Sequence, residues 1–134
     1  MPTLSGETLS SDMLLGKLTI VNFWATWCGP CIVEIPDLIA LYDEWSSRSF
    51  EIVGVSMDVE GFEIIAPFAE DFQIAYPLIV DEGQLAEEFG GVFALPTTFL
   101  VNAEGRIVYR FIGLFPFDEM REVMNQLLLE IESS

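Results

Sequence analysis

The sequence predicts an α/β domain, spanning residues 1–134, that is built around a parallel βαβ unit. Three observations carry this prediction. A stretch rich in β-branched and aromatic residues, 18–23, suits a buried strand. A helical pattern over 29–45 follows it, and the apolar run within 50–56 is typical of a second buried, parallel strand. The length of the chain allows one domain with a core of its own.

The helix over 29–45 connects the two strands and is predicted from its apolar spacing. Its apolar side chains recur at helical intervals: Ile32, Ile35, Leu38, Ile39, Tyr42 and Trp45. The strand that follows contains the run Ile52-Val53-Gly54-Val55, which is too short for a helix of its own. Together these segments form the βαβ unit.

A helix, a strand and a short helix are predicted in the middle of the chain. The helix covers about 60–72, in spite of Pro67, and turns these residues inward: Phe62, Ile65, Phe68, Ala69 and Phe72. A short apolar strand over 77–80 and a short helix over 84–89 complete this region.

The last third of the chain predicts a hairpin and a helix. The strands 98–101 and 106–111 flank the turn Asn102-Ala103-Glu104-Gly105, and a final helix begins at Asp118. The inner face of this helix is apolar: Met120, Val123, Met124, Leu127, Leu128 and Ile131. Such a stripe is expected to pack in the core rather than to form a cofactor site.

Charge and composition exclude several kinds of function. The chain carries 22 acidic and 5 basic side chains, for a net charge of −17, which argues against nucleic acid as a partner. The negative electrostatic field of the acidic side chains is expected to favour basic over acidic protein partners. Two cysteines and no histidine cannot supply the roughly four ligands of a structural zinc site, so no metal is expected. No apolar run approaches the ~20 residues of a membrane span, and the N-terminal residues do not form a signal core.

The only two cysteines, Cys28 and Cys31, lie where the first strand gives way to the long helix. At this position the free N–H groups and the dipole of the helix favour a thiolate, so we expect a lowered pKa for Cys28 and assign it as the nucleophile. Cys31 lies on the same helical stripe and is turned further inward, where it can resolve a mixed disulfide. Pro30 stiffens the loop between them. The pair predicts dithiol/disulfide exchange, rather than a purely structural disulfide in so short a loop.

Two motifs carry a family resemblance. Residues 24–31, Trp-Ala-Thr-Trp-Cys-Gly-Pro-Cys, look like a thioredoxin active site, and residues 95–100 look like the cis-proline segment that faces it. Through 21–24, 31–38 and 96–107 the chain is similar to thiol-disulfide oxidoreductases of the TlpA/ResA type. This resemblance implies a thioredoxin fold, with a central mixed β-sheet flanked by helices and a TlpA-like central helix and strand insertion.

Glu34 is the predicted proton acceptor. Asn22 stands where ordinary thioredoxins carry a buried aspartate, and the TlpA/ResA-like proteins resemble this chain in having a glutamate at position 34. Glu34 follows Cys31 by one helical turn, so a buried carboxylate there, with a raised pKa, can take the proton of that thiol. The alternative is an ordinary solvated glutamate on the surface of the helix.

The resemblance also implies a cis bond between Leu95 and Pro96 and a groove that holds an extended substrate by strand-like pairing. The substrate-binding residues expected from the motifs are Trp27, Gly29, Pro30, Leu95, Pro96 and Gly113. Phe93 is a further candidate for the apolar rim of this groove.

The predicted function is the reduction of protein disulfides, without a cofactor. For a TlpA/ResA-like protein the resemblance implies a membrane-embedded thiol donor, clients such as apocytochrome c, and a periplasmic or membrane-anchored location outside the cytoplasm. A cytoplasmic location, with a thioredoxin-reductase-like donor, is the less favoured reading. Two other functions are left open: a polypeptide-binding adaptor or chaperone with little redox turnover, and a thiol peroxidase on the same fold.

Overall fold

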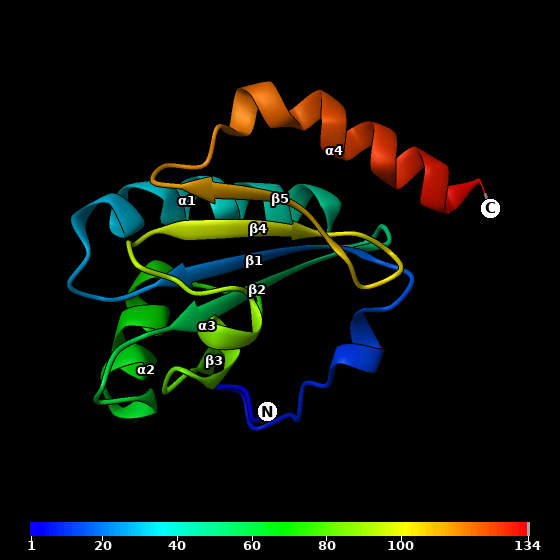
Figure 1. Ribbon diagram of the computed structural model, residues 1–134. Coiled ribbons are helices and arrows are strands. Elements are labelled where there is room, and N and C mark those ends of the chain that lie inside the picture. The colour runs from blue at the N-terminus through cyan, green and yellow to red at the C-terminus, as the bar shows by residue number, and fades with distance from the viewer. Residues whose placement is uncertain (134) are drawn as a thin grey trace.

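The computed structural model describes residues 1–133, which form a five-stranded sheet with helices on both faces (Figure 1). A 3-10 helix (Ser11–Leu14) precedes the first strand. The further elements, in chain order, are β1 (Leu18–Trp24), α1 (Gly29–Trp45), β2 (Phe50–Ser56), α2 (Phe62–Phe72), β3 (Leu78–Val80), α3 (Gln84–Glu88), β4 (Thr97–Val101), β5 (Ile107–Ile112) and α4 (Phe117–Glu132).

The sheet is mixed, with the strand order β3-β2-β1-β4-β5. β1 pairs in parallel with β2, from Leu18 opposite Phe50 to Trp24 opposite Ser56, and β2 pairs in parallel with β3. β4 runs antiparallel to both β1 and β5. All seven residues of β1 are buried, so this strand forms the centre of the sheet.

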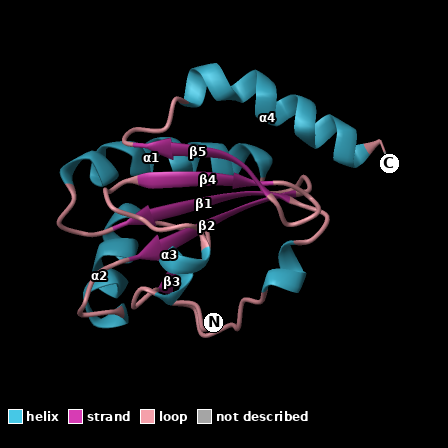
Figure 2. Ribbon diagram, in the orientation of Figure 1, coloured by secondary structure: helices cyan, strands magenta, loops and turns pink. Residues whose placement is uncertain are grey.

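The helices cover the two faces of the sheet unequally. α1, α2 and α4 contribute residues to the larger core cluster, as Ile35, Ile65 and Met124 illustrate. The other face packs against α3 and the N-terminal segment, through residues such as Ala86 and Leu14. Figure 2 shows α1 behind the sheet and the short α3 in front of it. The longest helices therefore lie on the face from which the redox motif is built.

The predicted elements are confirmed, with small shifts at their ends. α1 and β2 have the predicted bounds, and the helix between them makes the parallel crossover. α2 begins at Phe62 rather than near residue 60, because Gly61 has a φ of 68°, which lies outside the helical region. α4 begins one residue before Asp118. α2 and β3, which lie between β2 and β4 along the chain, form the predicted central insertion.

Candidate active site

The two cysteines lie at the junction of β1 and α1 and are joined by a disulfide bond, with Cα atoms 5.3 Å apart. After β1, the N–H of Cys28 donates to the carbonyl of Ala25 at 3.2 Å and closes a turn. Cys28 is the N-cap residue of α1, and its Sγ accepts a hydrogen bond from the backbone N–H of Cys31 at 3.3 Å. This N–H belongs to the first helical turn, whose donors have no partner within the helix. The helix start thus supplies a donor to Cys28.

The exposure of the motif decreases from its rim to its centre. Trp27 is 71% exposed, and Gly29 and Pro30 are exposed as well. Cys28 is 5% exposed and Cys31 is 1% exposed. Cys31 is thus the less exposed of the two cysteines, as predicted, but the difference is small. In this oxidised state, the indole of Trp27 is the main surface that the motif presents to solvent.

Glu34 is buried, at 2% exposure, so the alternative of a solvated helix glutamate is wrong. Its Oε1 accepts a hydrogen bond from Nδ2 of Asn22 at 2.7 Å, and its Oε2 accepts one from the backbone N–H of Phe115 at 3.1 Å. Nδ2 of Asn22 also donates to Oγ1 of Thr98 at 3.0 Å. The carboxylate therefore links α1 to β1 and to the loop before α4, and Asn22 extends this network to β4.

The pKa of Glu34 is raised above its ordinary value of 4.5. Burial is the largest cause, because it removes water from the charged form. The hydrogen bonds from Phe115 and Asn22 act in the opposite direction, and the negative charge of Asp37 raises the pKa further. A buried carboxyl with a raised pKa keeps its proton to higher pH than an exposed one, which suits it to exchange a proton with a neighbouring thiol.

The peptide bond between Leu95 and Pro96 is cis. Pro96 is buried and Leu95 is half-buried. The N–H of Gly113 donates to the carbonyl of Pro96 at 2.8 Å, so the loop after β5 is tied to the start of β4. Gly113 has a φ of 92°, which a residue with a side chain rarely adopts. Phe93, in the loop before this bond, is exposed.

The strand register brings these segments to one edge of the sheet. Phe23 lies opposite Thr97 in the antiparallel pair, so Pro96 precedes β4 at the end of β1 from which the redox turn departs. Ile112 lies opposite the same Thr97, so Gly113 follows at that edge. The redox turn, the cis-proline segment and the Gly113 loop therefore share the carboxyl end of β1, at the left of Figure 1.

Several residues near the site were missed from the sequence. Thr98 and Phe115 complete the hydrogen bonds around Glu34, and Asp58 binds the turn that precedes Cys28. A backbone N–H such as that of Phe115 has no sequence signal. Asp58 has one, because it follows a strand parallel to β1 and so leaves the sheet at the same edge as the redox turn.

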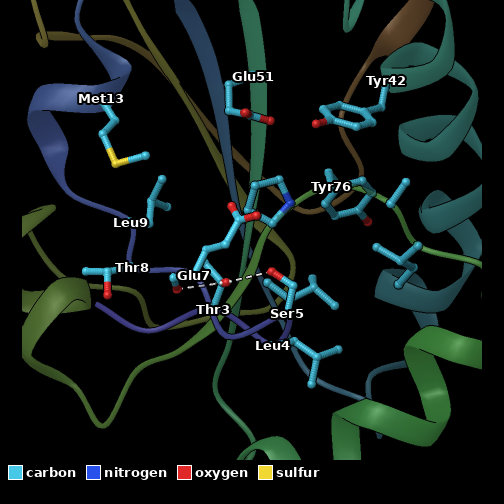
Figure 3. Close-up of a pocket in the computed structure, with 14 residues that line it drawn as sticks. Thr3, Leu4, Ser5, Glu7, Thr8, Leu9, Met13, Tyr42, Glu51 and Tyr76 are labelled. Atoms are coloured by element: carbon cyan, nitrogen blue, oxygen red, sulfur yellow. Dashed lines mark hydrogen bonds between the residues drawn. The ribbon is translucent and has the colours of Figure 1, made fainter.

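A cavity of about 450 Å³ lies elsewhere, beside the N-terminal segment and the beginning of β2. Its lining includes Glu7, Tyr42, Glu51 and Tyr76 (Figure 3) and no cysteine. Burial, with the charge of Glu51 and the hydrogen bond to it, raises the pKa of Tyr42 to about 12. Burial also raises the pKa of Glu51. The redox motif lies beyond the other end of β2, so this cavity is not part of the disulfide site.

The fold and the site together define the class of protein. A mixed sheet with a parallel βαβ unit and an antiparallel hairpin carries a Cys-x-x-Cys motif at a helix start and a cis-proline before β4. This combination is that of a thioredoxin-fold protein with a Cys-x-x-Cys disulfide. The chain belongs to the AhpC/TSA family, whose model matches residues 1–110.

Comparisons with known proteins agree with this class. The chain is 34% identical over 110 residues to the thiol-disulfide oxidoreductase ResA of Bacillus thuringiensis (strain Al Hakam), and the aligned region covers 82% of this chain and 63% of that protein. It is 31% identical to ResA of Bacillus subtilis (strain 168) over 90% of this chain and 67% of that protein. A crystal structure of a thiol:disulfide interchange protein of the thioredoxin family from Chlorobium tepidum TLS superposes with a TM-score of 0.86 at 32% identity, covering 96% of this chain and 91% of the other.

The chain thus spans less than two thirds of the B. thuringiensis relative. Within residues 1–133, no helix combines the length and the apolar character needed to cross a bilayer.

Proposed function

We propose that this protein reduces protein disulfides by dithiol/disulfide exchange at Cys28 and Cys31, as a single thioredoxin-like domain over residues 1–134. The observation that carries the proposal is the disulfide between the two residues at the N-terminus of α1, where Sγ of Cys28 accepts the N–H of Cys31. A donor at this place stabilises a thiolate more than a thiol. The names of the ResA relatives, thiol-disulfide oxidoreductases, support the same chemistry.

The reaction begins with the reduced protein. The thiolate of Cys28 attacks one sulfur of a substrate disulfide, which forms a mixed disulfide and releases the other substrate sulfur as a thiolate. Cys31 then loses its proton and attacks Sγ of Cys28. This step forms the Cys28–Cys31 disulfide and releases the second substrate sulfur, so that two electrons have passed to the substrate. A dithiol donor reverses the sequence and regenerates the reduced protein.

Glu34 is proposed to accept the proton of Cys31 during the second attack and to return it on reduction. Its place one helical turn beyond Cys31, its burial and its raised pKa support this role. The carboxylate accepts its hydrogen bonds from Asn22 and Phe115, so the exchange with Cys31 requires the reduced state or a bridging water.

The substrate is proposed to be an extended polypeptide that lies across the motif. The residues assigned to this groove are Trp27, Gly29, Pro30, Leu95, Pro96 and Gly113. Ile112 and Leu114, which flank Gly113, are exposed, as are Trp27 and Phe93. Exposed apolar side chains of this kind offer a sequence-tolerant contact surface to an unfolded segment.

The resemblance to TlpA/ResA-type proteins supports a location outside the cytoplasm, clients such as the Cys-x-x-Cys segment of apocytochrome c, and a membrane thiol donor. In a cytoplasmic setting the donor would be a thioredoxin reductase. Incubating the variant Cys31→Ser with extracts of each compartment traps clients on Cys28 as mixed disulfides, and identifying those clients decides between the two settings.

The function is tested by insulin reduction with dithiothreitol as the electron source. We expect turnover by the wild-type protein and none above background by Cys28→Ser, because only the first thiol can form the mixed disulfide. Insulin reduction by Cys28→Ser at the wild-type rate would contradict the proposal. Binding of unfolded polypeptide without turnover in the wild-type protein would favour the adaptor, and rapid oxidation by peroxide in stopped flow would favour the thiol peroxidase.

A further inference from the structure

We propose that Asp58 is a positioning residue for the redox turn: its carboxylate holds Thr26 and thereby fixes Cys28 at the N-terminus of α1. This inference rests on the proposed disulfide exchange and names a residue that sets the reactivity of the attacking thiol.

The sheet places Asp58 beside the redox turn. β1 and β2 are parallel and in register at their ends, with Trp24 opposite Ser56. The N–H of Met57 donates to the carbonyl of Trp24 at 2.8 Å and extends the pairing by one step. Thr26 lies two residues beyond the end of β1, and Asp58 lies two residues beyond the end of β2. The two loops therefore leave the sheet side by side.

Three donors from two segments converge on the carboxylate of Asp58, which is 2% exposed. The backbone N–H of Thr26 lies 3.2 Å from Oδ1 and 3.1 Å from Oδ2. The hydroxyl of Thr26 donates to Oδ1 at 2.7 Å, and the hydroxyl of Ser56 donates to Oδ2 at 2.7 Å. Hydrogen bonds to a buried carboxylate are short and strong, and removing one partner leaves a costly unpaired group. Asp58 thus bonds to Ser56 of its own strand and, directly and independently, to Thr26 of the redox turn.

Thr26 transmits this restraint to the attacking sulfur. It is the second residue of the four-residue turn from Ala25 to Cys28, which the N–H of Cys28 closes on the carbonyl of Ala25. The third residue, Trp27, projects into solvent, and Cys28 caps α1 with Sγ on the N–H of Cys31. A turn released at Thr26 would no longer hold Sγ on that donor. The thiolate would then lose stabilisation and the thiol would react more slowly at neutral pH.

Asp58 can act on the pKa of Cys28 through its restraint of the turn or through its negative charge, and these two effects have opposite signs. A carboxylate near Cys28 disfavours a second negative charge on the sulfur, so removing the charge would make the thiol more acidic. Removing the restraint would make it less acidic. The direction in which Asp58→Asn shifts the pKa of the Cys28 thiol therefore shows whether the restraint or the charge has the larger effect. If Asp58 served only stability, the pKa of this thiol would not change.

The test measures the rate of iodoacetamide alkylation against pH in a Cys31→Ser background, where Cys28 is the only thiol. The variants are Asp58→Asn, Thr26→Val and, as the control, Ser56→Ala. Ser56→Ala removes a 2.7 Å hydroxyl bond to the Asp58 carboxylate, together with the 3.0 Å bond from the Asp58 N–H to the same hydroxyl, but touches no residue of the turn. We expect the first two to move the midpoint upward and to lower the rate at neutral pH about three- to tenfold, the equivalent of one lost hydrogen bond. Ser56→Ala should change the alkylation rate less than about twofold, because it leaves the bonds between Thr26 and Asp58 in place. Thr26→Ser should react at the parent rate, because serine keeps the hydroxyl that bonds Asp58.

Two results would overturn the inference: a midpoint that is unchanged or lower in both Asp58→Asn and Thr26→Val, or an equal change in Ser56→Ala and Thr26→Val. Urea unfolding of each variant verifies that it folds, and if Asp58→Asn does not, the Thr26 and Ser56 pair still decides. A different result would contradict the proposed function itself: no insulin reduction by the wild-type protein, together with a Cys28 thiol in the Cys31→Ser protein that is no more acidic than free cysteine.

Discussion

Replacing Glu34 by glutamine is expected to flatten the dependence of stability on pH. Burial raises the pKa of this carboxyl in the folded protein above its ordinary value of 4.5, so the folded state binds the proton more tightly than the unfolded chain does. The stability that the carboxyl contributes is therefore complete below pH 4.5 and is lost as the pH rises through the folded pKa. Glutamine cannot ionise, so the variant lacks this loss.

The magnitude follows from the linkage between protonation and folding. Each unit by which the folded pKa of Glu34 exceeds its ordinary value corresponds to about 1.4 kcal/mol of unfolding free energy lost at high pH. The amide of glutamine can keep the network satisfied. If the Asn22 amide turns by half a rotation, its oxygen accepts from the new NH₂ and from the Thr98 hydroxyl, while the Phe115 N–H keeps its acceptor. Below pH 4.5, the two proteins should therefore agree within about 1 kcal/mol.

The assay is urea unfolding of the oxidised proteins, followed by tryptophan fluorescence from acidic to mildly alkaline pH at constant ionic strength. Glu63→Gln is the matched control, because Glu63 is an exposed carboxyl on α2. It should keep the wild-type pH dependence, whereas Glu34→Gln should gain stability over the wild type as the pH rises. A difference between wild type and Glu34→Gln that stays constant over the whole pH range would refute the reasoning.

Two further predictions follow from the site and the core. Glu34→Gln should leave the alkylation rate of Cys28 within about twofold but slow the resolution of a trapped mixed disulfide about 10²-fold or more, as expected for loss of a proton acceptor. Asp43→Asn, at an exposed position of α1, is the control and should leave both rates unchanged. Equal resolution rates in Glu34→Gln and the wild type would contradict the proposed role of Glu34. In urea unfolding, Leu128→Ala should lower the unfolding free energy by about 2–5 kcal/mol, because it leaves a cavity in the core. Leu129→Ala, at the exposed neighbouring position, should lower it by less than about 1 kcal/mol. Similar losses in both variants would show that α4 does not pack as described.

The α-helices and strands were predictable because most of them show a helical apolar period or a short run of β-branched and aromatic residues. α1 alternates buried and exposed residues at the helical repeat, and its predicted range, Gly29–Trp45, is the observed one. β1 is buried on both faces and is mainly apolar, with Thr19 and Asn22 as its two polar residues. The ends of α2 were less predictable, because the start depends on the backbone conformation of Gly61, and a glycine in the sequence does not specify its φ.

The chemistry of the site was predictable where it is local, and not where it depends on contacts between distant segments. The spacing of Cys28 and Cys31 places both residues at one helix start whatever the rest of the fold. The partners of Glu34 come from residues 12 and 81 positions away, and one of them, Phe115, contributes a backbone N–H. Asp58 reaches Thr26 across 32 positions. Such pairs follow from the register of the sheet, which periodicity does not fix.

Two buried carboxylates thus border the redox motif, and the hydrogen-bond donors that the structure gives them are neutral. Glu34 accepts from an amide and a backbone N–H, and Asp58 accepts from a backbone N–H and two hydroxyls. Neutral donors satisfy a carboxylate without cancelling its charge, so an extra negative charge on a nearby sulfur is opposed. A proton that passes from Cys31 to Glu34 leaves the total charge of this buried region unchanged. The thiolate needed for resolution can therefore form without adding to the buried negative charge, and this is the physical reason to expect a carboxyl with a raised pKa at position 34.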